Sequence, residues 1–473
     1  MSVSVINTPT VLAPRPWPKP LLVILGAGAV VRVLLWLWFA PLEPRIWDEN
    51  DYVQLARNIA THGEFAFSPG DPTSLRPPLY PAFVAAIYRV AGIDNYQAVR
   101  LAQLFVSLAT VVLVYRLGRV VFSERTGLWA AGLLCFSPSY LGSGNLILTE
   151  ALFTFWLTAG TLALVTGLNR GQLTYLAGAG VLLGLGALTR SILWLCPPLV
   201  GLFLLGAWPG SLGRRFLAAV VFAVPFALVL APWAVRNTEL QKTLVVVDCM
   251  GGRNFMMGNY EYTPLYRSWD AIAIEGDHSW HTVLCAETDP ALRDTQGKLD
   301  KLALARGLKF VKENPGLSLQ RGVIKFFDFW GLDRELVAGA DRGFFGPISR
   351  AGVIVLGLLV CGFFAVVLSA SVFGAVLQPP RDIRVHLLLL AIVAFVCGIH
   401  SVVFAHSRYR LPVMPVVMLY AAAAITSQGI WSRRHRPGFW IAVGVCLLFV
   451  GGWVWNAVAG DFARVLQAVG LGS

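Results

Sequence analysis

Long apolar runs recur along almost the whole chain. About eleven of them reach the ~20 residues that a helix needs to cross the hydrocarbon core of a bilayer. These runs lie near residues 21–40, 98–121, 127–145, 149–168, 174–189, 192–208, 216–234, 350–377, 385–404, 411–428 and 438–456. With 56% hydrophobic and 14% charged residues, the chain has too few polar side chains to cover a soluble globule. The sequence therefore predicts an all-α polytopic membrane protein with about eleven transmembrane helices.

Arginines in the short connections orient these helices. They fall on alternate connections, and the positive-inside rule places those connections in the cytoplasm. The arginines are Arg116, Arg119, Arg125, Arg170, Arg214, Arg215, Arg381, Arg384, Arg433, Arg434 and Arg436. Because the basic residues behind the net charge of +12 are dispersed and form no stripe, a nucleic-acid partner is disfavoured. The alternation leaves two long polar segments on the extracytoplasmic side.

These two segments divide the chain into three parts. Residues 1–234 are expected to form an N-terminal transmembrane module that includes the external loop 41–97. Residues 235–349 are expected to form a small external loop domain, and residues 350–473 the C-terminal transmembrane helices. The loop domain contains no dinucleotide fingerprint or phosphate loop, so nothing in it indicates binding of a nucleotide sugar.

Helical spacing predicts elements within the external segments. In the first loop, Asp48 to Thr61 is expected to form an amphipathic surface helix, and Pro77-Pro78 opens a second helix. In the loop domain, the apolar residues between Lys298 and Lys312 predict another helix.

Acidic residues lie at the external margin of the predicted membrane. Asp48 and Glu49 follow the first span, and Glu150 begins the fourth. Carboxylates beside hydrocarbon are costly unless they are used or solvated, and a partly desolvated one can serve as a general base. The alternative for Asp48 and Glu49 is that they only mark or cap the start of the surface helix.

Four arginines are predicted at the same membrane face. Arg76 precedes Pro77-Pro78, Arg190 lies in a short external turn, and Arg408 and Arg410 precede the tenth span. A guanidinium pairs a phosphate through two parallel hydrogen bonds, so these residues suit a phosphate-linked leaving group. Each alone is equally well explained as a snorkelling anchor. No histidine spacing indicates a metal site.

Two cysteines lie outside the apolar runs. Cys249 and Cys285 fall in the external loop domain, where an oxidising milieu permits a disulfide. The sequence does not show whether the two thiols are within bridging distance. A disulfide between them therefore stays open at this point.

Six groups of residues resemble motifs of a known family, in order and over nearly the whole chain. They are Asp48-Glu49 with Tyr52 and Ala56; Arg76-Pro77-Pro78-Leu79-Tyr80; Thr149-Glu150; Ala231-Pro232-Trp233 with Arg236-Asn237; Gly251-Gly252-Arg253-Asn254 with Gly258-Asn259; and Arg408-Tyr409-Arg410-Leu411-Pro412 with Pro415. The chain resembles the bacterial glycosyltransferase family 39, which is related to protein O-mannosyltransferases and to the lipid A aminoarabinose transferase. That resemblance implies the GT-C architecture.

The resemblance also implies roles for individual residues. Asp48 is the presumed catalytic base with Glu49 beside it, and Glu150 lines the cavity. Arg76 contacts the lipid phosphate, and Arg408 lies near it, with Arg410 as an equal candidate. Tyr52, Tyr80 and Asn259 lie in the same motifs and are expected to line the substrate cavity. Arg190 belongs to none of these motifs, and its expected role in the phosphate site rests on its charge and its predicted place at the same membrane face.

The implied activity is an inverting transfer of a sugar from a polyprenyl-phosphate donor to a lipid, glycan or protein acceptor. It takes place at the extracytoplasmic side of the bacterial inner membrane. No cofactor is expected. A divalent metal stays possible, although Leu75 stands where some lipid A-modifying relatives carry an acid.

Two other classes of protein compete with this interpretation. A transporter or flippase of polyprenyl-linked glycans would also need acids and arginines in a membrane cavity, but that class tends to show internal repeats. No repeat is apparent in this sequence. A scaffold without chemistry would leave the external charges without a role.

The arginine pattern predicts which loops face outward. In a background where Cys249 and Cys285 are replaced by serine, a cysteine at Ser68 should react with a membrane-impermeant maleimide in intact cells. A cysteine at Ser432 should react only after the membrane is permeabilised. Labelling of the Ser432 position in intact cells would overturn the orientation.

Overall fold

The computed structural model describes residues 17–40, 42–427, 429 and 431–461. Its ordered elements are helices, apart from two short antiparallel strands, β1 (Ala66–Ser68) and β2 (Asp71–Pro72). Two helices, α2 (Trp47–His62) and α3 (Leu79–Ala91), lie in the first loop and are described below. The other helices before the predicted loop domain are α1 (Lys19–Trp38), α4 (Tyr96–Val121), α5 (Glu124–Cys135), α6 (Pro138–Ser143), α7 (Glu150–Arg170), α8 (Leu173–Thr189), α9 (Cys196–Ala207) and α10 (Leu212–Gln241). Those after it are α16 (Arg350–Leu377), α17 (Ile383–Val402), α18 (Met414–Thr426) and α19 (Pro437–Trp455).

The predicted all-α membrane fold is confirmed. The described residues contain eight helices that are long and apolar enough to cross a membrane. The remaining predicted runs are helical but shorter or interrupted. The run at 127–145 is divided between α5 and α6 at Pro138, whose ring cannot continue a helix interior. The run at 192–208 comprises the 3-10 helix η1 (Ser191–Leu195) and then α9, and α8 has 17 residues.

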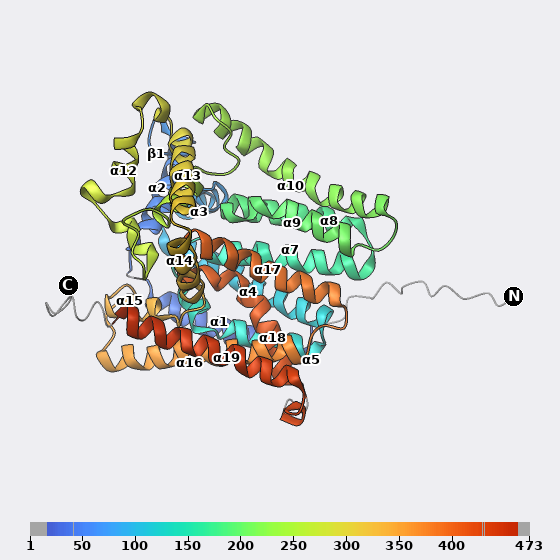
Figure 1. Ribbon diagram of the computed structural model, residues 1–473. Helices are drawn as coiled ribbons and strands as arrows, with labels where there is room; N and C mark the ends of the chain where they lie inside the picture. The colour runs from blue at the N-terminus through green and yellow to red at the C-terminus, as the bar shows by residue number, and fades with distance from the viewer. Residues whose placement is uncertain (1–16, 41, 428, 430, 462–473) are drawn as a thin grey trace.

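The elements of the two segments that the arginine pattern predicts to be external gather at one end of the bundle, which we call the external end (Figure 1). They are α2 (Trp47–His62), α3 (Leu79–Ala91), α11 (Gly251–Met257), α12 (Trp280–Glu287), α13 (Gln296–Glu313), α14 (Pro315–Phe329) and α15 (Arg334–Asp341). The predicted helices over Asp48–Thr61, after Pro77-Pro78 and over Lys298–Lys312 therefore correspond to α2, α3 and α13. The predicted start of the loop domain at residue 235 lies inside α10. Cys249 and Cys285 are both free thiols, so the structure contains no disulfide between them.

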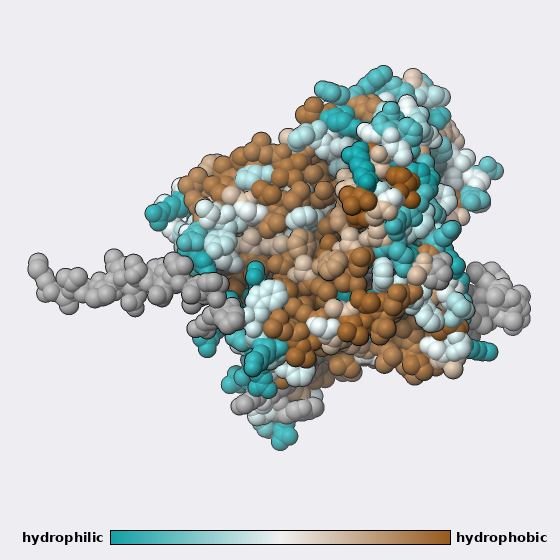
Figure 2. Space-filling view, turned by 180° about the vertical axis from the view of Figure 1, so that it is seen from behind, coloured by the Kyte–Doolittle hydropathy of each residue, from teal (hydrophilic) through white to brown (hydrophobic). Residues whose placement is uncertain are grey.

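Apolar side chains cover the flank of the bundle. Figure 2 shows a broad hydrophobic face over the helices and hydrophilic residues concentrated over the external end. Large exposed apolar residues occur on α1, α9, α10, α16 and α19, for example Leu34, Leu202, Leu228, Leu358 and Leu447. Such a surface is stable against lipid and not against water.

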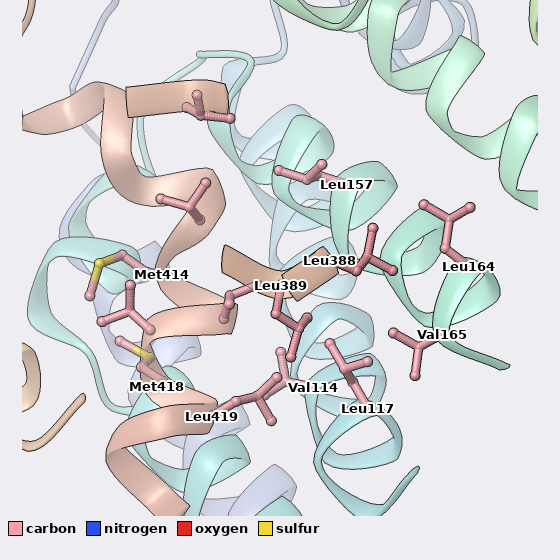
Figure 3. Close-up of a cluster of buried hydrophobic side chains, with 14 of the residues drawn as sticks. Val114, Leu117, Leu157, Leu164, Val165, Leu388, Leu389, Met414, Met418 and Leu419 are labelled. Atoms are coloured by element: carbon pink, nitrogen blue, oxygen red, sulfur yellow. The ribbon is translucent and has the colours of Figure 1, made fainter. Parts of the chain in front are cut away.

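A buried core joins the N-terminal and C-terminal helices. Side chains of α4, α7, α17 and α18 pack together, among them Val114, Leu157, Leu388 and Leu419 (Figure 3). Every residue of α18 from Met414 to Ala424 is buried. The preceding 3-10 helix η5 (Ser407–Val413) is thereby held beside α7 at the external end of the core.

Arg410, on η5, is a buried structural residue. Its side chain is 1% exposed and donates hydrogen bonds to the carbonyls of Phe329 and Gly331 and to the carboxylate of Asp333. The guanidinium carbon also lies 3.6 Å from the centroid of the Phe364 ring. Through these hydrogen bonds, Arg410 holds the connection after α14 against the helix bundle.

Glu49, on α2, closes the start of its own helix. Its Oε2 accepts hydrogen bonds from the backbone N–H of Arg45 at 3.0 Å and of Ile46 at 3.1 Å. Its Oε1 accepts one from the N–H of Ile147 at 2.8 Å, in the connection between α6 and α7. The residue is 2% exposed. Glu49 is therefore a capping residue that also ties two connections together.

Removing Arg410 should destabilise the fold. Arg410→Met leaves the Asp333 carboxylate buried without its cation, so we expect the free energy of unfolding to fall by about 3–5 kcal/mol. The matched control is Arg384→Met, since Arg384 pairs with Asp382 at 2.7 Å where both side chains are about a third exposed. Exposed pairs contribute about 0–1 kcal/mol. Chemical unfolding in detergent measures both variants, and equal losses would contradict the assignment.

Neutralising Glu49 should also lower stability. In Glu49→Gln, an amide N–H₂ group replaces one acceptor oxygen and meets backbone N–H donors. A buried donor left unsatisfied costs about 1–3 kcal/mol. Glu43→Gln is the control, because Glu43 is exposed on the same connection. Unchanged unfolding of Glu49→Gln would mean that the cap contributes nothing.

Candidate functional site

Asp48 lies between two arginines at the external end of the bundle. Its Oδ1 accepts a hydrogen bond from Arg76 Nη2 at 2.9 Å, and its Oδ2 accepts one from Arg408 Nη2 at 2.7 Å. Asp48 is at the start of α2, Arg76 precedes α3, and Arg408 is on η5. Three distant parts of the chain therefore meet at one carboxylate.

Glu150 extends the network on the side of Arg408. Its Oε1 lies 3.0 Å from Arg408 Nε and 3.3 Å from Arg190 Nη1. Glu150 is only 1% exposed, and its Oε2 is buried without a hydrogen-bond partner. An unpartnered buried carboxylate oxygen is costly, so this atom is suited to accept a hydrogen bond from a ligand.

Asp51 extends the network on the side of Arg76. Its Oδ2 accepts hydrogen bonds from Arg76 Nε at 3.0 Å and from Nη2 at 2.7 Å. We call the six residues of this network the charge cluster: Asp48, Asp51, Glu150, Arg76, Arg190 and Arg408. Asp51 belongs to the same acidic stretch of the sequence but was not among the predicted site residues, and its position three residues after Asp48 on a helix places both on one face. That spacing is the signal that identifies it.

A set of hydrogen bonds at Ser74 positions Arg76. The Ser74 hydroxyl donates to Asn237 Oδ1 at 2.9 Å and accepts from Gln241 Nε2 at 3.0 Å, both on α10. Its N–H donates to Gln296 Oε1 of α13 at 2.9 Å, and its carbonyl accepts from the N–H of Cys249, also at 2.9 Å. Ser74 is fully buried. Arg76, which follows two residues later, is therefore presented from a rigid segment.

Aromatic rings line the charge cluster. The Arg76 guanidinium lies 5.6 Å from the Tyr52 ring centroid, and that of Arg190 lies 5.1 Å from the ring of Tyr409. The Arg408 guanidinium lies 5.7 Å from the same Tyr409 ring. Such cation–π contacts hold the guanidinium groups in place and exclude water. Tyr80 packs edge-on against Tyr52 and donates a hydrogen bond from its hydroxyl to Gln103 Oε1. Tyr80 therefore supports the Tyr52 ring and does not itself border the charge cluster.

The electrostatic surroundings make Asp48 a weak base as it stands. Burial alone would raise the pKa of the Asp48 carboxyl, but Arg408 and Arg76 more than offset burial, and the pKa lies well below its usual range. Burial raises the pKa of the Asp51 carboxyl, and Arg76 only partly opposes this effect. Asp48 therefore gains proton affinity only when its arginines are drawn to another anion.

Asp248 is a further acid near the cluster that the sequence did not single out. Ser191, next to Arg190, lies close to the Asp248 side chain, and Asp248 Oδ1 accepts a hydrogen bond from the N–H of Met250 at 3.2 Å. Burial raises the pKa of the Asp248 carboxyl to about 6, and Arg76 is close enough to lower it in part. No spacing in the sequence connects Asp248 with the first external loop.

The structure brings some predicted site residues together and separates others. Asp48, Glu150, Arg76, Arg190 and Arg408 form the cluster, and Tyr52 borders it. Glu49 caps α2, and Arg410 is bonded to Asp333. Asn259 lies outside the cluster. Its Oδ1 accepts a hydrogen bond from Lys325 Nζ at 3.2 Å, and its Nδ2 donates to the carbonyls of Phe255 and Val402. Within the part of the chain that the structure describes, no group of three or more His, Cys, Asp or Glu side chains is arranged to hold a metal ion.

Comparisons with known proteins agree with this picture. The family described as dolichyl-phosphate-mannose-protein mannosyltransferase matches residues 75–235. The undecaprenyl phosphate-alpha-4-amino-4-deoxy-L-arabinose arabinosyl transferase 2 of Pseudomonas fluorescens is 28% identical over 197 residues, which cover 39% of this chain and 33% of that protein. The corresponding transferase of Erwinia tasmaniensis is 25% identical over 207 residues, which cover 42% of this chain and 37% of that protein.

A solved structure supports the fold. The archaeal oligosaccharyltransferase AglB from Archaeoglobus fulgidus shares it with a TM-score of 0.52 and 17% identity, over 92% of this chain and 54% of AglB. The matches to the two transferases span between a third and two fifths of their length. The chain is thus similar to these transferases over part of its length, and it shares the membrane-protein fold of AglB.

Proposed function

We propose that this chain is a membrane glycosyltransferase that moves a sugar from a polyprenyl-phosphate donor to an acceptor hydroxyl on the extracytoplasmic side, with inversion. The observation that carries the proposal is the carboxylate of Asp48 held between Arg76 and Arg408. Such a transfer is served by a base for the acceptor hydroxyl and by cations that stabilise the leaving phosphate. The names of the arabinosyl transferases and the dolichol-phosphate bound to AglB support a polyprenyl-phosphate donor.

Donor binding rearranges the charge cluster. Without donor, the three arginines are neutralised by three carboxylates. A lipid phosphate competes for Arg76 and Arg408, because a guanidinium pairs phosphate oxygens bidentately. As the arginines turn toward the phosphate, Asp48 loses the interactions that depress its pKa. The donor thus generates its own base.

The chemical step follows from this arrangement. Asp48 takes the proton of the acceptor hydroxyl, whose oxygen attacks the anomeric carbon from the face opposite the phosphate. The bond between that carbon and the phosphate oxygen breaks, and the phosphate leaves with the electron pair. Arg76 and Arg408 neutralise the departing charge, and oriented charges in a water-poor site are the larger contribution to catalysis.

The remaining members of the cluster orient these groups. Glu150, on α7, orients Arg408 through an ion pair and is itself paired with Arg190. The unpartnered Oε2 of Glu150 can accept a hydrogen bond from a hydroxyl of the sugar or the acceptor. Asp51 holds Arg76 through two nitrogens. The site residues Asp48 and Arg76 belong to α2 and to the segment before α3, at the end of the bundle that the arginine pattern predicts to face outward (Figure 1).

A transfer assay tests the proposal and identifies the sugar. Purified protein in lipid nanodiscs is incubated with a panel of polyprenyl-phosphate sugars that are radiolabelled in the sugar, together with bacterial envelope lipids, glycans or proteins as acceptors. We expect one label to leave the lipid and appear on an acceptor. Movement of an intact donor across a vesicle membrane without loss of its sugar would instead indicate a flippase.

Two substitutions should separate the base from the phosphate site. Asp48→Asn should lower turnover by about 10²–10⁴-fold yet bind donor at least as tightly as the wild type, because a competing carboxylate is gone. Arg76→Ala should weaken donor binding by about 2–5 kcal/mol, and Arg76→Lys should restore only part of it. Donor titration and single-turnover transfer measure both quantities.

The control is Arg57→Ala. Arg57 lies later on α2 and forms a partly exposed ion pair with Asp94, which precedes α4, so its replacement should change neither quantity. Near-normal transfer by Asp48→Asn would remove Asp48 as the base. In that case Asp248 would be the next residue to replace.

A further inference from the structure

Helix α14 has one exposed face that carries no charge. Leu319 and Val323 lie one turn apart on this face and are 72% and 50% exposed. The three charged residues of α14, which are Arg321, Lys325 and Asp328, lie on the other side of the helix. Large apolar side chains that are exposed together, without a neighbouring charge, are unfavourable in water and indicate a surface that contacts something apolar.

The charged side of α14 is bonded to the loop domain. Arg321, which is 4% exposed, donates hydrogen bonds to the carbonyls of Tyr260 at 3.0 Å and Thr263 at 2.6 Å. Lys325, which is 1% exposed, donates to the carbonyl of Gly258 at 2.8 Å. All three acceptors belong to the segment directly after α11. This segment therefore lies on the charged side of α14, and the apolar face points away from it.

The end of α14 meets α19 below the external end of that span. The Phe326 ring is stacked on the Phe449 ring, with 6.2 Å between the centroids, and a side chain at Gly452 would overlap the Phe327 ring. Phe449 and Gly452 lie six and three residues before Trp455, the last residue of α19. At ~1.5 Å per residue they are about 9 Å and about 4.5 Å below that end. α14 therefore packs against the side of a membrane span and not on its tip.

The exposed face of α14 adjoins the lipid-facing surface of the bundle. Leu448, next to Phe449 on α19, is 58% exposed, and Val402, the last residue of α17, is 56% exposed. The carbonyl of Val402 accepts a hydrogen bond from Lys325 Nζ at 3.2 Å, so α14 lies beside the external end of α17 (Figure 1). With 15 residues, α14 is about 22 Å long, too short to cross a hydrocarbon core of ~30 Å. α14 therefore borders the membrane without crossing it.

We propose that α14 lies in the external leaflet of the membrane with Leu319 and Val323 inserted among the lipid acyl chains. Amphipathic helices bind a bilayer in this way, and both neighbours of α14, α17 and α19, face lipid. A protein partner is disfavoured, because the face offers it no charge to pair. The carbonyl of Phe329, at the end of α14, accepts a hydrogen bond from Arg410, so the embedded helix is connected to η5, which carries Arg408. This inference does not depend on the proposed function.

Fluorescent probes on the apolar face test the proposal. Leu319→Cys and Val323→Cys are made in the full chain after the three half-buried cysteines, Cys285, Cys361 and Cys446, have been replaced by alanine, because the other four are buried. Each variant is labelled with the environment-sensitive dye NBD and placed in nanodiscs of phosphatidylethanolamine and phosphatidylglycerol. A lipid with a nitroxide on its acyl chain should quench both probes, and iodide in the water should leave them bright.

Two other leucines serve as matched controls. Leu448→Cys, on α19, should be quenched by the nitroxide lipid to a similar extent, whereas Leu304→Cys, on α13 and 40% exposed one turn after Lys301, should be quenched by iodide. Iodide quenching at Leu319 and Val323 as strong as at Leu304 would place the face in water and overturn the proposal. Protection of both probes from both quenchers would overturn it as well, because another protein surface would then cover the face.

Discussion

The bond between Asp48 and Arg408 joins residues 360 positions apart, and the architecture of the external end depends on it. Neither charge is stable alone at the margin of a membrane, where an unpaired ion is strongly disfavoured. Their pairing requires α2 to lie against η5, and η5 is held in place by α18 in the buried core. Packing in the membrane therefore determines where the external carboxylate is found.

The charge cluster combines stability with reactivity. Three carboxylates and three arginines neutralise one another, so the site can be desolvated without a net charge. The same pairing suppresses the basicity of Asp48 until another anion takes its place. Under the proposed function the donor phosphate is such an anion, and it carries the bond to be broken. The resting charge cluster would then respond to the arrival of the donor.

Much of this was accessible from the sequence. Helical spacing and the Pro77-Pro78 pair predict α2, α3 and α13, because local periodicity and proline geometry act within a few residues. Alternating arginines predict that Asp48, Arg76, Glu150 and Arg408 share one membrane face. The interrupted runs were harder to predict, because hydropathy does not reveal where Pro138 divides a helix.

The roles of Glu49 and Arg410 were not accessible in the same way. Their partners are the N–H of Ile147 and the carbonyls of Phe329 and Gly331, and backbone groups carry no sequence signal. Two acids or two arginines that are nearly adjacent look alike in the sequence. Tertiary packing alone turns one member of each pair toward the cluster and the other toward the backbone.

The hydrogen bonds around Ser74 have a consequence for how chains with this fold can diverge. Asn237 and Gln241 reach Ser74 from the last turns of α10, and one residue added to that helix would rotate everything after it by about 100°. The segment of Arg76 would then lose the hydrogen bonds of Ser74 to α10, although Arg76 lies far from α10 in the sequence. The stretch around Gly70, at the exposed turn between β1 and β2, has no such connection to the arginine. Insertions there would lengthen the rim of the charge cluster and leave the position of Arg76 unchanged, so new contacts can arise at the turn but not along α10.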